Sequence, residues 1–121
     1  MDIQTFFESF PQSYKIYLVV NEVIEALGPS SVQITKSQIR YSTSHHFAYL
    51  WIPGRYQKGR VAPLVLSIPL PYVDETVDWK EVVEVRSAVY MHHKELWTSS
   101  DLDCHVVHTL RSAYSGESHA R

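Results

Sequence analysis

Apolar residues recur at helical spacing in the first 28 residues of the chain. Asp2 can cap a short helix that carries Phe6 and Phe10 on one face. This helix is expected to end at Phe10, because Pro11 disfavours a helical conformation at the residue before it. A second helix starts with Pro11 in its first turn and stops at Gly28. Its predicted buried stripe consists of Ile16, Val19, Val20, Val23 and Leu27.

From Ser31 onward the apolar residues alternate with polar ones, which predicts β-strands. Pairing Ile34 with Ile39 makes Lys36-Ser37 a two-residue turn between two short strands. Neither turn residue is the glycine or asparagine that such turns prefer, so a β-bulge is the alternative. Further strands are predicted over residues 47–52, 64–70, 79–86 and 90–96. Strand limits or an unpaired edge are indicated by Pro63, Pro69 and Pro71.

The last predicted element is a helix whose start near Ser100 and Asp103 fits a capping box. Gly116 ends this helix, and the tail from about residue 116, Glu117–Arg121, is expected to be frayed. The apolar face of the helix consists of Leu102, Val106, Leu110 and Ala113, with Tyr114 beside it. The whole order predicts a single α+β domain over residues 1–121. In it, a mostly antiparallel sheet of five or six strands is covered on one face by the N-terminal helices and the C-terminal helix.

Composition narrows the class of protein further. With 121 residues, of which 45% are hydrophobic and 20% charged, the chain has the make-up of one soluble globular domain. The formal net charge of −2 provides no overall positive field for nucleic acid or membrane surfaces. Cys104 is the single cysteine, which excludes an intramolecular disulfide. No signal-peptide pattern and no apolar run of membrane-spanning length is present, so a cytoplasmic protein without a membrane partner is predicted.

Two adjacent histidines lie inside the predicted strand 90–96. Successive strand side chains point to opposite faces, so one histidine faces the core and its neighbour faces outward. One face is predicted to hold Tyr90, His92, Lys94 and Leu96, and the other Met91, His93, Glu95 and Trp97. Imidazole can bind a ligand or transfer a proton near neutral pH, and Glu95 could orient His93. The catalytic candidates are therefore His92, His93 and Glu95; alternatively, one histidine packs against the sheet and the other is solvated.

Two other polar stretches are candidate sites. The turn Thr35-Lys36-Ser37-Gln38 brings a hydroxyl, an ammonium and an amide together, which suits an anionic or amide-bearing ligand, although turns are also polar for solubility alone. The basic residues Arg55, Lys58 and Arg60 around Tyr56 suit phosphate groups and a stacked base. A solvated loop is the simpler interpretation of this second stretch.

Metal binding has only a weak signal. Cys104, His105 and His108 are spaced as on one turn of a helix, but no partner motif of metal-ligand spacing exists elsewhere. No metal and no cofactor are therefore predicted, and Cys104 is expected to be a small buried residue. The tryptophans Trp51, Trp79 and Trp97 are expected to pack across the sheet, unless one of them lines a pocket.

Several short motifs in order resemble an uncharacterised bacterial family, known as domain of unknown function 5655, from about Phe6 to Tyr114. The motifs are Thr35-Lys36-Ser37-Gln38, Phe47-Ala48, Pro63-Leu64-Val65-Leu66-Ser67, Trp79-Lys80-Glu81-Val82-Val83, Met91-His92-His93-Lys94-Glu95-Leu96, and Asp101-Leu102-Asp103 with Leu110 and Ala113-Tyr114. Similar domains look like the C-terminal part of predicted transport proteins. The element order also looks like small MmcQ/YjbR-type folds, sometimes called DNA-binding. The resemblance implies that the motif residues Lys36, Ser37, Gln38, Trp79, Lys80, His92, His93 and Glu95 converge on one side of the sheet.

These observations lead to four hypotheses for function. The preferred one is a binding module that holds a small anionic or polar ligand mainly through Lys36, Gln38, His92 and His93, with Thr35, Ser37, Trp79, Lys80 and Glu95 nearby. A small enzyme would use His92 or His93 as general acid/base. A weak nucleic-acid-binding domain would use Arg40, Arg55, Lys58, Arg60 and Lys36. A structural domain, such as a homodimer, would bury Tyr49, Trp51 and Tyr56 against a partner.

Overall fold

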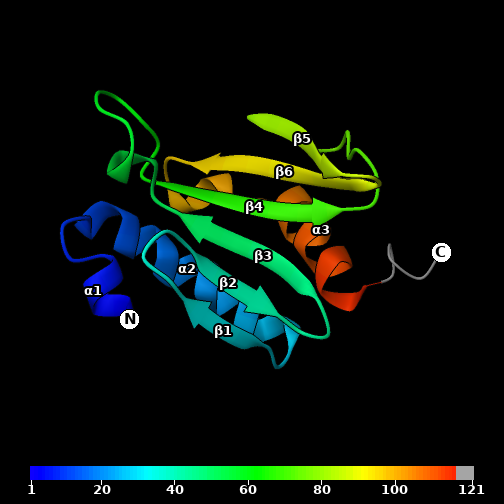
Figure 1. Cartoon of the computed structure of the whole chain (residues 1–121), viewed down its shortest axis with the longest axis horizontal. Coiled ribbons are helices and arrows are strands. Elements are labelled where there is room, and N and C mark those ends of the chain that lie inside the picture. Colours follow the sequence, from blue (N-terminus) through cyan, green and yellow to red (C-terminus); the bar gives the residue numbers. More distant parts are fainter. Residues whose placement is uncertain (117–121) are drawn as a thin grey trace.

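The computed structural model describes residues 1–116 and has the predicted α+β architecture, with the helices packed on one face of an antiparallel sheet (Figure 1). The helices are α1 (Ile3–Phe6), α2 (Pro11–Leu27) and α3 (Cys104–Ser115). The strands are β1 (Ser31–Ile34), β2 (Ile39–Ser42), β3 (His46–Trp51), β4 (Leu64–Leu70), β5 (Glu81–Arg86) and β6 (Val89–Leu96). The frayed tail predicted for Glu117–Arg121 lies outside the described residues.

The N-terminal helices begin where the sequence predicts. The Asp2 side chain accepts a hydrogen bond from the Thr5 backbone N–H at 2.8 Å and caps α1, and α2 begins at Pro11. The predicted buried stripe of α2 is wrong at Val19, which is 40% exposed. Adjacent helical residues are turned by roughly 100° from one another, so Val19 points away from the face that Val20 buries. That face consists of Ser13, Ile16, Tyr17, Val20 and Ile24.

The start of α3 differs in detail from the prediction. Thr98 and Asp101 form a capping box around a short 3-10 turn at Ser99–Asp101, so the pair predicted from Ser100 and Asp103 is not the capping box. Asp103 is instead the N-cap of α3, and its carboxylate accepts hydrogen bonds from the backbone N–H groups of His105 and Val106. Cys104 is exposed rather than buried, because the buried side of α3 is formed by the later residues Val106, Thr109, Leu110 and Ala113.

The six strands follow the order β1-β2-β3-β4-β6-β5, and every neighbouring pair is antiparallel. The pairing of Ile34 with Ile39 confirms the two-residue turn at Lys36-Ser37. The Thr35 hydroxyl stabilises this turn, since its oxygen accepts hydrogen bonds from the backbone N–H groups of Ser37 and Gln38. The turn therefore forms without a glycine.

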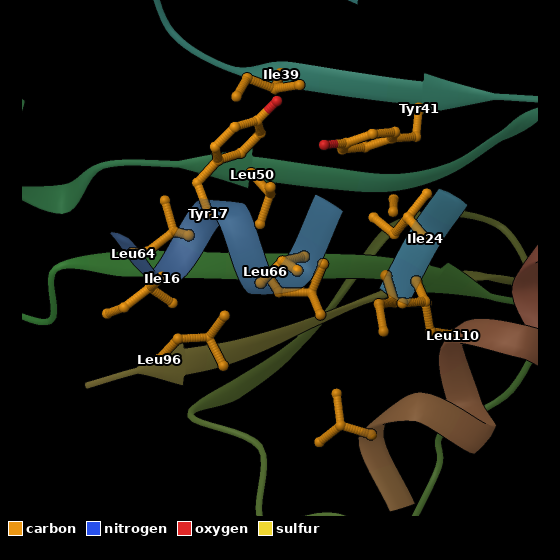
Figure 2. Close-up of a cluster of buried hydrophobic side chains, with 14 of the residues drawn as sticks. Ile16, Tyr17, Ile24, Ile39, Tyr41, Leu50, Leu64, Leu66, Leu96 and Leu110 are labelled. Carbon is orange, nitrogen blue, oxygen red and sulfur yellow. The ribbon is translucent and has the colours of Figure 1, made fainter. Parts of the chain in front are cut away.

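The core lies between the sheet and the two long helices. Figure 2 shows Ile16, Tyr17 and Ile24 of α2 pointing toward strand side chains such as Ile39 and Leu66. All seven residues of β4 are buried: β4 lies between β3 and β6, and its even-numbered side chains enter the core. Its odd-numbered residues point to the other face, where Ser67 contacts Trp51 and His93. Within residues 1–116, no helix has both the length and the apolar character needed to cross a membrane.

Candidate functional site

The two histidines of β6 lie on opposite faces of the sheet, as the strand alternation predicts. His92 pairs with Ile68, a core residue, and is 0% exposed on the face covered by the helices. His93 pairs with Ser67 and lies on the other face, which is called the open face below because no helix within residues 1–116 packs on it. The two rings therefore cannot contribute to one pocket.

His92 is a structural residue with both ring nitrogens satisfied. Its Nδ1 lies 2.9 Å from the carbonyl oxygen of Tyr90, and its Nε2 lies 2.9 Å from the backbone nitrogen of Asp74. The Asp74 N–H can only donate, so Nε2 accepts and Nδ1 carries the proton that is donated to Tyr90. Burial lowers the pKa of His92, although hydrogen bonds to backbone carbonyls and the charge of Asp74 raise it. His92 is therefore neutral and anchors the loop that begins at Asp74.

That loop is ordered around the Asp74 carboxylate. The carboxylate accepts hydrogen bonds from the backbone N–H and the hydroxyl of Thr76. It also accepts one from the Trp79 indole nitrogen, at 3.1 Å. The Trp79 ring packs edge-on against His92, with ring centroids 5.0 Å apart. His92 thus fixes the position of Trp79 and of the segment that leads to Lys80.

His93 is held on the open face by a chain of hydrogen bonds. The Trp51 indole nitrogen donates to the Ser67 hydroxyl at 3.0 Å, and the Ser67 oxygen lies 2.7 Å from Nδ1 of His93. The Trp51 and His93 rings also meet edge to face at 6.2 Å. The sequence predicts that Glu95 orients His93, but Glu95 instead accepts a hydrogen bond from the Trp97 indole nitrogen at 3.3 Å. The residue that orients His93 is therefore Ser67.

A cavity of about 260 Å³ lies beside His93 on the open face. Its polar lining consists of Gln57, Lys80, Glu81, His93 and Glu95. Its apolar lining consists of Trp51, Pro53, Val61 and Val65. The strands β3, β4, β5 and β6 thus supply the floor, and the loop that follows β3 supplies a wall.

A second cavity, of about 360 Å³, shares Lys80 and Glu95 with the first. It also contains Trp79, which packs against His92, and Lys94, which alternates onto the same face as His92, so this cavity reaches the helix-covered side of the sheet. The other residues lining it are Asp78, Trp79, Lys94, Trp97 and Asp101. The two cavities together form the candidate site. Of the predicted site residues, it contains Trp79, Lys80, His93 and Glu95.

Burial lowers the pKa of His93 below its ordinary value, while the carboxylate of Glu81 raises it and the neighbouring His92 lowers it. Glu81 is the direct cross-strand partner of His93. Because burial is the largest of these effects, His93 is neutral at pH 7 and acts in the cavity as a hydrogen-bonding group rather than a charge.

The turn at Thr35-Lys36-Ser37-Gln38 is not part of this site. It joins β1 to β2, and β2 is separated from β6 by β3 and β4. Three strand spacings amount to roughly 14 Å, and neither cavity of the candidate site is lined by residues of the turn. The predicted convergence of Lys36 and Gln38 with both histidines is therefore wrong, because the sheet order keeps the turn apart and places His92 on the opposite face.

The basic residues predicted to contact nucleic acid do not act as one group. The Arg55 guanidinium lies over the rings of Phe6 and Phe10 and donates to the Phe6 carbonyl. The guanidinium of Arg60 lies 5.0 Å above the Trp97 ring. Lys58 is exposed in the loop after β3, and Arg40 lies in β2. Two of the five predicted cations, which include Lys36 in the turn between β1 and β2, are thus already engaged within the protein.

Sequence reasoning missed Ser67, Glu81 and Gln57 as site residues. Ser67 could have been found, because it is the one hydroxyl in the otherwise apolar strand Leu64–Leu70 and is 3% exposed, and buried polar groups need partners. Glu81 and Gln57 carry no comparable signal, because their positions depend on the pairing of β5 with β6 and on the path of the loop after β3.

Comparisons with known proteins leave the family open. No family model, no curated protein and no solved structure matches the chain. The resemblance to domain of unknown function 5655 and to MmcQ/YjbR-type folds therefore stays a prediction. Within residues 1–116, no group of three or more histidine, cysteine, aspartate or glutamate side chains is placed to hold a metal ion. Function has to be inferred from the geometry of the site.

Proposed function

We propose that this domain is a binding module for a small polar ligand, which it holds on the open face of the sheet. The supporting observation is the cavity beside His93, where an immobilised imidazole, an ammonium, two carboxylates and an indole ring surround a space of about 260 Å³. Small-molecule sites commonly combine an apolar wall with a few converging polar groups. Trp51, Pro53, Val61 and Val65 provide the apolar lining. Lys80, Glu81, His93 and Glu95 provide the polar groups.

The hydrogen-bond chain explains what His93 offers to a ligand. Ser67 has a single hydroxyl proton, and its oxygen already accepts from the Trp51 indole N–H. The same oxygen has a second lone pair, so the contact at Nδ1 fits two tautomers of neutral His93: the hydroxyl donates to Nδ1, or Nδ1–H donates to the hydroxyl oxygen. Nε2 accordingly meets a ligand as a donor in the first tautomer and as an acceptor in the second.

The burial of Ser67 favours binding over catalysis. The hydroxyl hydrogen-bonded to His93, at 2.7 Å, is that of Ser67. Ser67 itself is 3% exposed and accepts from Trp51, so it is not available as a nucleophile. An enzyme that uses His93 as acid/base remains the alternative, supported by the 2.7 Å contact between Ser67 and His93.

A thermal-shift screen with small amines, sugars, carboxylates and nucleotides tests the proposal. A ligand at about one hundred times its dissociation constant adds roughly 2.7 kcal/mol to the free energy of unfolding, which is several degrees in Tm for a domain of this size. The shift should be lost in His93→Ala and kept in His108→Ala, whose histidine is exposed on α3. A shift that survives in His93→Ala would place the ligand elsewhere.

A further inference from the structure

All three tryptophans of the chain line the two adjoining cavities. Trp51 lines the cavity beside His93, and Trp79 and Trp97 line its neighbour. The sequence predicts that these residues pack across the sheet, unless one of them lines a pocket. Trp79 also packs edge-on against His92 on the helix-covered side of the sheet, so aromatic recognition in the cavity beside His93 depends on Trp51.

Each of these indoles has its N–H group satisfied within the protein. Trp51 donates to Ser67 at 3.0 Å, Trp79 to Asp74 at 3.1 Å, and Trp97 to Glu95 at 3.3 Å. The indoles are therefore not set up as hydrogen-bond donors for a ligand. What they offer are ring faces, whose negative quadrupole attracts cations.

The charged groups around the cavities have the sign that suits a cation. Four carboxylates line them, against the ammonium groups of Lys80 and Lys94 and the Arg60 guanidinium over Trp97. The carboxylates belong to Asp78, Glu81, Glu95 and Asp101. Lys94 approaches the Asp78 carbonyl at 3.4 Å, and the Asp101 carboxylate accepts from the backbone of Trp97 and Thr98. Within the cavity beside His93, Glu81 and Glu95 face a single cation, Lys80.

One of the protein's own cations already uses this type of recognition. The Arg60 guanidinium lies 5.0 Å from the centre of the Trp97 ring, and the Trp97 indole N–H is bound to Glu95. An indole next to a carboxylate thus holds a positive charge beside the second cavity, which Trp97 lines. The ring of Trp51, in the cavity with Glu81 and Glu95, has no such cation within residues 1–116.

We propose that the ligand is a small organic cation, an ammonium or guanidinium compound, held in the cavity beside His93 with its charge between Glu81 and Glu95 and against the ring of Trp51. This inference rests on the proposed function and specifies the chemical class of the ligand. It replaces an anionic ligand, because an anion would have to approach two carboxylates with only Lys80 to compensate.

Titration of the ¹⁵N-labelled domain with a matched pair of probes tests the inference. Choline carries a quaternary ammonium, and 3,3-dimethylbutan-1-ol has the same shape without the charge. The three indole N–H signals report on the site directly, and that of Trp51 is assigned with Trp51→Phe. Choline should move the Trp51 signal in a saturable way, and the neutral alcohol should bind at least about tenfold more weakly, because it lacks the cation–π contact.

Variants of the carboxylates separate the possible outcomes. Glu81→Gln and Glu95→Gln should each weaken choline binding several-fold, whereas Glu22→Gln on the exposed side of α2 should leave it unchanged; a native-like spectrum of each variant shows that it is folded. Two outcomes would refute a cationic ligand but leave the proposed binding site standing. One is equal binding of choline and the alcohol, and the other is a shift of the Trp51 signal with acetate or phosphate but not with choline. No movement with choline, alcohol, acetate, phosphate or glucose would count against both the inference and the proposed function.

Discussion

Replacement of His92 by alanine is expected to destabilise the domain by about 3–5 kcal/mol, the scale of large-to-alanine substitutions in protein cores. His92 is 0% exposed, and its ring packs edge-on against Trp79. The substitution also leaves the Asp74 N–H and the Tyr90 carbonyl without the partners that they have at 2.9 Å. Each buried polar group that loses its partner costs roughly 1–3 kcal/mol, so the lost hydrogen bonds contribute a large part of the effect.

The same residue makes the stability depend on pH. Burial lowers the pKa of folded His92 below the unfolded value of about 6.5. Between these two pKa values the unfolded chain binds more protons, so the stabilising contribution is complete above the unfolded pKa and is lost as the pH falls below it. His93 acts in the same direction, because burial also lowers its pKa. His92→Gln, which cannot titrate, should therefore show a weaker loss of stability on acidification than the parent.

Urea unfolding at about pH 7.5 and about pH 5.5 measures both effects, with free energies obtained by linear extrapolation. His108→Ala is the matched control, because His108 is exposed and its removal should change stability by no more than about 0.5 kcal/mol. A loss below about 1 kcal/mol for His92→Ala would show that its hydrogen bonds do not hold the Asp74 loop. Equal pH dependence in the parent and His92→Gln would show that His92 is not the group that titrates.

Three further substitutions test other parts of the structure, each by its effect on Tm or on the free energy of unfolding. Gly28→Ala should destabilise the domain clearly more than Gly59→Ala. Both glycines have positive φ, but only at Gly28 would the new Cβ collide with the Tyr114 hydroxyl. Equal losses of stability would mean that backbone strain, and not this collision, determines the effect. Asp103→Ala should lower the free energy of unfolding by about 1 kcal/mol, because α3 loses its N-cap, and Asp103→Asn should lower it far less. Equal losses of stability in the two variants would argue against capping by Asp103. Ser67→Ala should lower the free energy of unfolding by about 1–3 kcal/mol, because it leaves the Trp51 indole N–H unpaired. An unchanged NMR signal of that indole N–H in the variant would contradict the loss of this hydrogen bond.

The fold was largely predictable because its signals are local. Pro11 and Gly28 mark the ends of α2, and the change from helical spacing to alternation after Ser31 marks the start of the sheet. The alternation of β6 correctly separated His92 from His93. The prediction of buried residues failed where a side chain lies at the border of a helix face. Val19 is an example, because it lies just outside the buried face of α2.

The site was harder to predict, because it depends on which strands become neighbours. The order β3-β4-β6-β5 brings Trp51, Ser67, His93 and Glu81 side by side, although they come from four separate strands. Alternation within a strand indicates which face a side chain occupies, but not which strand lies beside it. For this reason Lys80, His93 and Glu95 could be selected from the sequence, whereas their separation from Lys36 could not.

The position of the ligand is the most direct test of the proposed binding function. Backbone and indole chemical shifts of the ¹⁵N-labelled domain can be followed during titration with small amines, polyols and carboxylates. Binding on the open face should move signals of Trp51, Lys80, His93 and Glu95 together, and leave those of Lys36 and its turn unchanged. Ligand-induced shifts centred on the Lys36 turn, with the His93 cavity unaffected, would contradict the proposed site.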